Sequence, residues 1–90
     1  MRPLITPRVN LNGTSKRELV HQQMEICQVI GALQSAMRQA TPNGRDFQTV
    51  ENGERLCNEA RNAFNDRYNA LTTMFEEFQQ LAIDIQKQGE

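Results

Sequence analysis

Apolar residues recur along two long stretches of the chain at the spacing of amphipathic α-helices. In the first stretch, from about residue 15 to 40, they repeat every seven positions with two more between them: Leu19, Ile26, Leu33 and Ala40, then Ile30 and Met37. The second stretch, from about 51 to 88, carries a longer series and a partner series: Cys57, Phe64, Leu71, Phe78 and Ile85, then Ala60, Arg67, Met74 and Leu81. Such seven-residue repetition is typical of helices packed along their length. The pattern predicts an all-α fold, an antiparallel helical hairpin.

Local signals mark the ends of these helices. Ser15 with Glu18 three residues later forms a capping box, which predicts the start of the first helix. Thr41-Pro42 ends that helix, because the residue before a proline avoids the α region. In the loop of about residues 41–50, we expect Asn43-Gly44 to make a tight turn with positive φ and Asp46 to cap the second helix. Residues 1–14 contain two prolines and are expected to form an extended arm before the hairpin of residues 15–90.

The two predicted helices differ in length. About 26 residues give ~39 Å and about 36 residues give ~54 Å at 1.5 Å per residue. Paired from the loop outward, the second helix extends past the first and leaves four apolar residues uncovered: Phe78, Leu81, Ala82 and Ile85. Either the N-terminal arm folds back over them or another protomer covers them. A lone hairpin buries one seam and is marginally stable. We therefore expect a homo-oligomer, most simply a dimer that forms a four-helix bundle, with Phe75, Phe78, Leu81 and Ile85 at its interface.

Composition and charge exclude several classes of partner. The net charge of −1 and the pI of about 5.8 provide no bulk attraction to nucleic acid or to anionic membranes. No window approaches the roughly 18 apolar residues of a membrane-spanning helix. The first residues also lack the apolar segment of a secretory signal. We therefore expect an intracellular protein with no membrane or nucleic-acid partner, whose Cys27 and Cys57 are free thiols.

The sequence contains little material for catalysis. His21 is the only histidine, and no Ser, Cys or Asp stands near it in a known catalytic spacing. Glu76, Glu77 and Asp84 do not form the Glu-x-x-His pairs of di-metal bundles, and the cysteines lack zinc-ligand spacing. No glycine-rich phosphate loop is present. We expect no enzymatic activity, no metal and no cofactor.

Three features are candidates for binding, and one of them is a line of asparagines on the outer face of the second helix: Asn58, Asn62, Asn65 and Asn69. These asparagines are either a solvated face or hydrogen-bonding contacts to a partner helix or ligand.

The second feature is the loop residues Asn43, Gly44, Arg45, Asp46 and Phe47. They form either a purely structural turn or a recognition element in which the guanidinium of Arg45 grips a carboxylate or phosphate. The third is Arg67, whose place in the inner series is costly for a charge unless it is paired. It either pairs with a glutamate such as Glu25 or, together with Arg61, holds an anion between protomers.

Two motifs resemble those of a widespread group of small bacteriophage proteins. They are Asn10-Leu11-Asn12-Gly13-Thr14-Ser15 before the first helix and Pro42-Asn43-Gly44-Arg45-Asp46-Phe47 before the second. In that group an N-L-N-G-T-S-like start precedes a helix, and a P-[NH]-G-R-D-[FY] loop leads into a second helix. The resemblance covers most of the chain except the arm before Asn10. It implies a phage origin and a setting in the host cytoplasm.

Three hypotheses of function follow. Small non-enzymatic phage proteins often antagonise host systems, so the first hypothesis is an oligomeric binding protein that inhibits a host defence protein. The second is a sponge that sequesters a cyclic-nucleotide immune signal at an oligomer interface, by analogy with phage proteins that are oligomers of helical hairpins. The third is a structural or assembly component of the virion.

Overall fold

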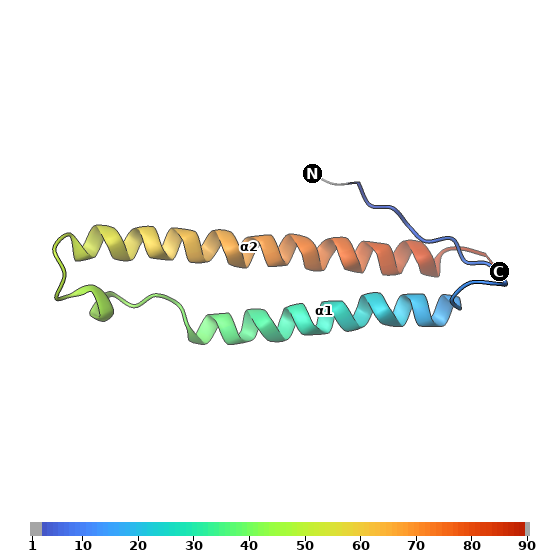
Figure 1. Ribbon diagram of the computed structural model, residues 1–90, viewed down its shortest axis with the longest axis horizontal. Coiled ribbons are helices and arrows are strands. Elements are labelled where there is room, and N and C mark those ends of the chain that lie inside the picture. The colour runs from blue at the N-terminus through green and yellow to red at the C-terminus, as the bar shows by residue number, and fades with distance from the viewer. Residues whose placement is uncertain (1–2, 90) are drawn as a thin grey trace.

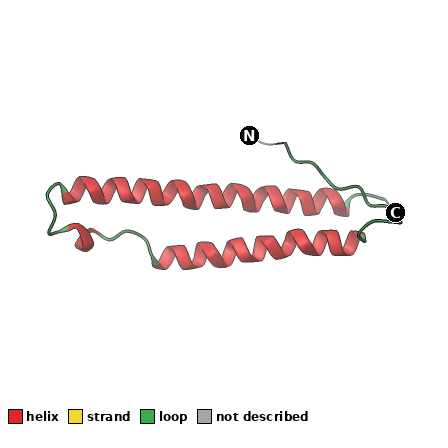
Figure 2. Cartoon of the chain, in the orientation of Figure 1, coloured by secondary structure: helices red, strands yellow, loops and turns green. Residues whose placement is uncertain are grey.

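The computed structural model describes residues 3–89, and it is a long helical hairpin (Figure 1). Helix α1 spans Lys16–Gln39, a short 3-10 helix η1 spans Gly44–Phe47, and helix α2 spans Gly53–Gln86. The described residues contain no strand, and the two long helices lie side by side and antiparallel in a rod of 63 × 24 × 17 Å (Figure 2). The predicted all-α hairpin is confirmed. Neither helix has a stretch that is long and apolar enough to cross a membrane.

Both ends of α1 follow from local sequence. The hydroxyl of Ser15 accepts a hydrogen bond of 3.2 Å from the backbone N–H of Glu18, as the capping box predicts. At the other end, the N–H of Ala40 donates to the carbonyl of Met37 at 2.8 Å. Pro42 then lies two residues beyond the last paired amide, where the helix cannot continue.

The seam between the helices uses residues at alternating intervals of three and four. On α1 the inward residues are Val20, Gln23, Cys27, Ile30, Gln34 and Met37, and on α2 they are Phe64, Tyr68, Leu71, Phe75, Phe78, Ala82 and Ile85. The most buried apolar side chains of the described chain are Cys27, Ile30, Cys57, Ala82 and Ile85. The predicted series from Cys57 to Ile85 therefore lies on the inner face of α2.

The other predicted series are rotated away from this seam. On α1, Ile26 and Leu33 are 37% and 48% exposed, because the helix turns Cys27 and Gln34 inward instead. On α2, Met74 is 43% exposed and Arg67 is also exposed, while Tyr68, Phe75 and Ala82 occupy the inner positions. The placement of Arg67 in the inner series was wrong.

Two polar contacts inside the seam fix the register of the helices. The buried amide of Gln34 donates to the carbonyl of Tyr68 at 3.2 Å and to the hydroxyl of Thr72 at 2.7 Å. The thiol of Cys27 donates to the carbonyl of Phe75 at 3.6 Å. A buried amide without partners is costly, so a shifted pairing of the helices would lose these bonds and be disfavoured.

This register leaves no overhang at the C-terminal end of α2. The ammonium group of Lys16, the first residue of α1, donates to the carbonyl of Gln88 at 2.8 Å, so the two ends lie level. The extra length of α2 lies at the loop end, where the connection and η1 run beside it (Figure 1). The expected overhang was wrong: Ile85 is 0% exposed within one chain, and Phe75 and Phe78 are half-buried in the seam. Leu81, which was predicted with them, is half-buried on the flank.

The N-terminal arm is held to the end of α2 by the side chain of Gln88. Its amide oxygen accepts from the N–H of Val9 at 2.8 Å, and its amide nitrogen donates to the carbonyl of Pro7 at 2.6 Å. From there the arm runs back past the end of α2 (Figure 1). The arm is therefore tethered to its own chain at Pro7 and Val9, while Leu4 and Ile5 stay exposed.

Cys27 makes the stability of this seam dependent on pH. Burial raises the pKa of the Cys27 thiol above 9.0, because desolvation disfavours the thiolate. The pKa of Cys27 is higher in the folded chain than in the unfolded chain. Its contribution to the free energy of unfolding is therefore fully present below the unfolded pKa, and it is lost as the pH rises through the folded pKa. We expect the free energy of unfolding to fall between about pH 7 and about pH 10, and to fall less in Cys27→Ala. Urea unfolding followed by circular dichroism at both pH values measures this difference; equal slopes in the two proteins would contradict it.

Candidate functional site

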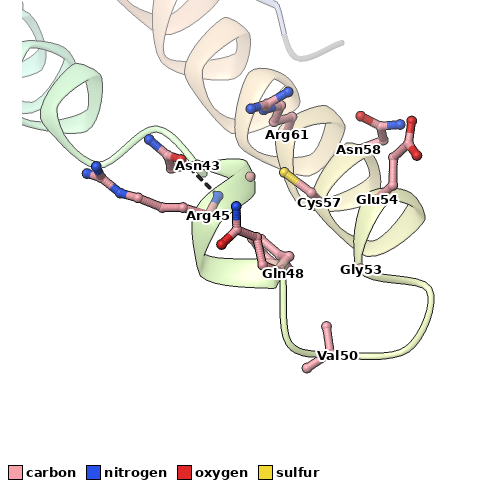
Figure 3. Close-up of a pocket in the computed structure, with 11 residues that line it drawn as sticks. Asn43, Arg45, Gln48, Val50, Gly53, Glu54, Cys57, Asn58 and Arg61 are labelled. Atoms are coloured by element: carbon pink, nitrogen blue, oxygen red, sulfur yellow. Dashed lines mark hydrogen bonds between the residues drawn. The ribbon is translucent and has the colours of Figure 1, made fainter.

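A pocket of about 650 Å³ lies at the loop end of the hairpin (Figure 3). One wall is the loop, which contributes Asn43, Gly44, Arg45, Phe47, Gln48 and Val50. The other wall is the start of α2, which contributes Gly53, Glu54, Cys57, Asn58 and Arg61. The volume is in the range of about 300–1,000 Å³ that is usual for small-molecule sites.

The loop wall is shaped by Asn43. Its side-chain oxygen accepts from the N–H of Arg45 at 3.0 Å, and its carbonyl accepts from the N–H of Asp46 at 3.0 Å, which starts the 3-10 turn. Gly44 does not have the positive φ that we expected. That conformation is found at Asn52, with φ of 60°, and Asn52 rather than Asp46 is the residue that precedes α2. Asp46 does not line the pocket.

The two walls approach most closely at Gly53. A Cβ added to Gly53 would overlap the carbonyl oxygen of Phe47, which is part of the backbone. The N–H of Gly53 donates to the carbonyl of Val50 at 3.1 Å and closes the turn between η1 and α2. The absence of a side chain at Gly53 therefore allows the loop to lie against α2 and form the pocket.

Two arginines give the pocket its positive charge. Arg61 is fixed by a hydrogen bond of 3.2 Å from its Nε to the carbonyl of Pro42, which leaves its terminal nitrogens available. Arg45 is exposed and extends from the turn away from α2 (Figure 3). Glu54 is the acidic residue of the lining, and it makes no ion pair with either arginine. The pocket thus combines one positioned guanidinium with a second that can turn toward a ligand at the rim.

Cys57 and Asn58 complete the α2 wall. The sulfur of Cys57 points toward the turn in Figure 3, and this side chain is only 4% exposed, so it forms the apolar floor. No group of three or more His, Cys, Asp or Glu side chains that could hold a metal occurs in residues 3–89. The lining offers hydrogen-bond donors and positive charge but no arranged acid–base pair.

Sequence reasoning identified much of this lining and missed part of it. The predicted residues Asn43, Gly44, Arg45, Phe47 and Arg61 all line the pocket. Cys57 was not predicted as a binding residue, although it stands one helical turn before Arg61 and so shares its face. Asn58 was a candidate only as part of the asparagine line on the outer face of the second helix.

Arg67 does not belong to this pocket. It is exposed on α2, about 1.7 helical turns beyond Arg61. Its expected pairing with Glu25 is absent among the described residues: Glu25 lies 3.7 Å from the imidazole of His21 instead. Because Arg67 is exposed, its charge needs no counter-ion within the hairpin.

Comparison with known proteins adds no relative. No family model, no curated protein and no solved structure matches this chain.

Proposed function

We propose that the chain is a non-enzymatic phage accessory protein that sequesters a cyclic-nucleotide signal of host immunity, acting as a homo-oligomer in the host cytoplasm. The observation that carries this proposal is the pocket at the loop end, with Arg61 positioned by Pro42 and Arg45 at its rim. A forked guanidinium suits the paired oxygens of a phosphate. The resemblance of the two motifs to small phage proteins supports the phage origin.

The geometry of the pocket changes the order of the hypotheses drawn from sequence. The sequence alone favoured a host protein as the target. The two arginines of the loop-end pocket suit a small anionic ligand, whereas a protein partner usually needs a broad contact area. Sequestration also needs no catalytic residue, in keeping with a lining that has no arranged acid–base pair.

Calorimetry with matched variants tests this function. Titration of the purified protein with cyclic di- and trinucleotides should release heat with at least one of them. Arg61→Ala should weaken that binding by about tenfold or more, since a hydrogen bond to a charged group contributes about 1.5–3 kcal/mol. Arg45→Ala should weaken it less, because the exposed side chain must be ordered first.

Arg55→Ala is the matched control. It removes the same charge from the same helix, and Arg55 does not line the pocket. Binding to this variant should stay within about twofold of the unaltered protein, since an exposed charge that makes no direct contact with the ligand contributes little in salt. No heat with any cyclic nucleotide, or equal losses in Arg61→Ala and Arg55→Ala, would overturn the proposal.

Inhibition of a host protein is the second candidate, and exposed apolar residues of the N-terminal arm favour it. Ile5 is 81% exposed and Leu11 is 101% exposed, and exposed apolar residues that gather on one segment can mark a protein contact. Tagged protein recovered from infected cells would carry a host protein in a fixed ratio if this function is correct. A virion component would instead be found by mass spectrometry in purified particles.

A further inference from the structure

One side of the hairpin is apolar along most of its length. Residues that flank the seam on that side repeat at intervals of three, four and seven: Leu19, Ile26, Val29 and Leu33 on α1, and Met74 and Leu81 on α2. These six residues are called the apolar face. Ala36 and Ala40 continue the stripe on α1, which also contains Gln22 but no charged residue from Leu19 to Ala40. On α2, Ala70 lies in the stripe together with Arg67 and Glu77.

The two stripes of the apolar face lie on the same side of the hairpin. Met24 of α1 lines a shallow pocket together with Gln79 and Ile83 of α2, so these flanks share one side. Each helix has a second flank on the other side of the seam, and these two flanks must share the side of the hairpin opposite Met24 and Ile83. In an antiparallel pair, the second flank carries Ile26 on α1 and Met74 on α2.

We infer that the apolar face binds the apolar face of a second copy of this chain, with the two hairpins antiparallel in a four-helix bundle. This inference deepens the assembly part of the proposed function and rests on it. The stripe from Leu19 to Ala40 is about 32 Å long, and two packed helices of about 10 Å diameter are about 20 Å wide, which gives roughly 640 Å² per copy. A standard interface buries about 800 Å² on each side.

Charge selects this arrangement of the two copies. On α2 the stripe contains Arg67 and the half-buried Glu77, five residues to either side of Thr72. If the two-fold axis crosses α2 at Thr72, Arg67 faces Glu77 of the partner subunit, and the pair occurs twice. Neither residue makes an ion pair within the described hairpin, so both are available.

The other helix has its centre at the same level. The bonds from Gln34 to Thr72 and from Cys27 to Phe75 place residues near Gly31 level with Thr72. The α1 stripe from Leu19 to Ala40 is centred between Val29 and Ile30, close to that level. A single two-fold axis at the level of Thr72 therefore passes close to the middle of both stripes. The alternative axis, parallel to the helices, would set Glu77 against the apolar stripe of the other α1, where its charge has no partner.

Two sets of variants test the inference by multi-angle light scattering and sedimentation. The unaltered protein should have at least twice the mass of one 10.3 kDa chain. Val29→Glu places two carboxylates near the axis and should give monomers. Gln28→Glu adds the same charge at the exposed neighbouring position off the apolar face, and it should leave the mass unchanged. Circular dichroism verifies that both variants remain helical.

Charge reversal tests the position of the axis. Arg67→Glu and Glu77→Arg should each raise the dissociation constant by about tenfold or more, because each sets like charges together twice. The double variant Arg67→Glu/Glu77→Arg should return it to within about threefold of the original. Rescue within one chain is impossible, since the two residues are ten apart on one helix, about 15 Å.

The outcomes separate the parts of the inference. Self-association through the apolar face is overturned if the unaltered protein is a monomer. It is also overturned if Val29→Glu and Gln28→Glu both keep the mass of the unaltered protein. Loss of association in both single charge variants without rescue in the double variant overturns the axis at Thr72. Nucleotide titration reports on ligand binding alone, so its failure is distinguishable from either result.

Discussion

Replacing Ile85 with alanine is expected to lower the free energy of unfolding by about 3 kcal/mol, within the ~2–5 kcal/mol usual for such a change in a core. Ile85 is the largest fully buried side chain of the described residues, at 0% exposed. It lies where the end of α2 meets the start of α1, with the N-terminal arm held nearby through Gln88. A cavity there would weaken all three segments at once.

Ile83→Ala is the matched control for this change. Ile83 lies two residues away on the same helix and is 41% exposed, so the same atoms are lost with little change in burial. Ile83→Ala should lower the free energy of unfolding by less than about 1 kcal/mol. Urea unfolding followed by circular dichroism, at one protein concentration because association adds stability, compares the two. Equal losses would show that Ile85 is not a core residue.

The expected result at Ile85 differs from what sequence alone predicted for that residue. The seven-residue series placed Ile85 correctly on the inner face of α2, but the length of the helices suggested that no part of the same chain covers it. The register depends on Gln34 and on the path of the connection, which returns along α2 instead of reversing in a tight turn. Neither a polar residue in the seam nor a long connection appears in the seven-residue repeat of apolar residues, so the repeat could not predict the register of the helices.

The sequence of α1 contains two apolar stripes, and this explains why the predicted seam was rotated. One stripe, with Cys27 and Ile30, packs against α2, while the other, with Ile26 and Leu33, lies on the apolar face. Periodicity favours the second stripe because it is more uniformly apolar, whereas the inner stripe includes Gln23 and Gln34. A helix that contacts two neighbours needs both stripes, and periodicity alone does not tell which neighbour belongs to the same chain.

The loop was located correctly from its motif, but its geometry was not. Asn43-Gly44 was expected to reverse the chain, yet Asn43 starts a 3-10 turn and the left-handed residue is Asn52. Asn-Gly and Asn52-Gly53 are the same dipeptide, so local sequence offers two places for the turn. The contact between Gly53 and the carbonyl of Phe47, which is a tertiary feature, distinguishes them.

Gly53→Ala is expected to lower the free energy of unfolding by about 2 kcal/mol and to abolish ligand binding in the loop-end pocket. The added methyl group overlaps a backbone carbonyl, which cannot rotate away as a side chain can, so the loop must move from α2. Gly53 and Phe47 both line the pocket, and its shape depends on their approach. The same change therefore weakens the fold and the site together.

Gly31→Ala is the control with the opposite expected sign. A Cβ at Gly31 meets nothing within 4 Å, and the residue lies in the middle of α1. Alanine should stabilise the helix there by about 0.5–1 kcal/mol, because glycine loses more backbone entropy on folding. Thermal unfolding measures both variants, and nucleotide calorimetry measures the pocket. Stabilisation by Gly53→Ala would mean that the loop does not lie against α2. Retained binding in that variant would mean that the ligand does not occupy the loop-end pocket.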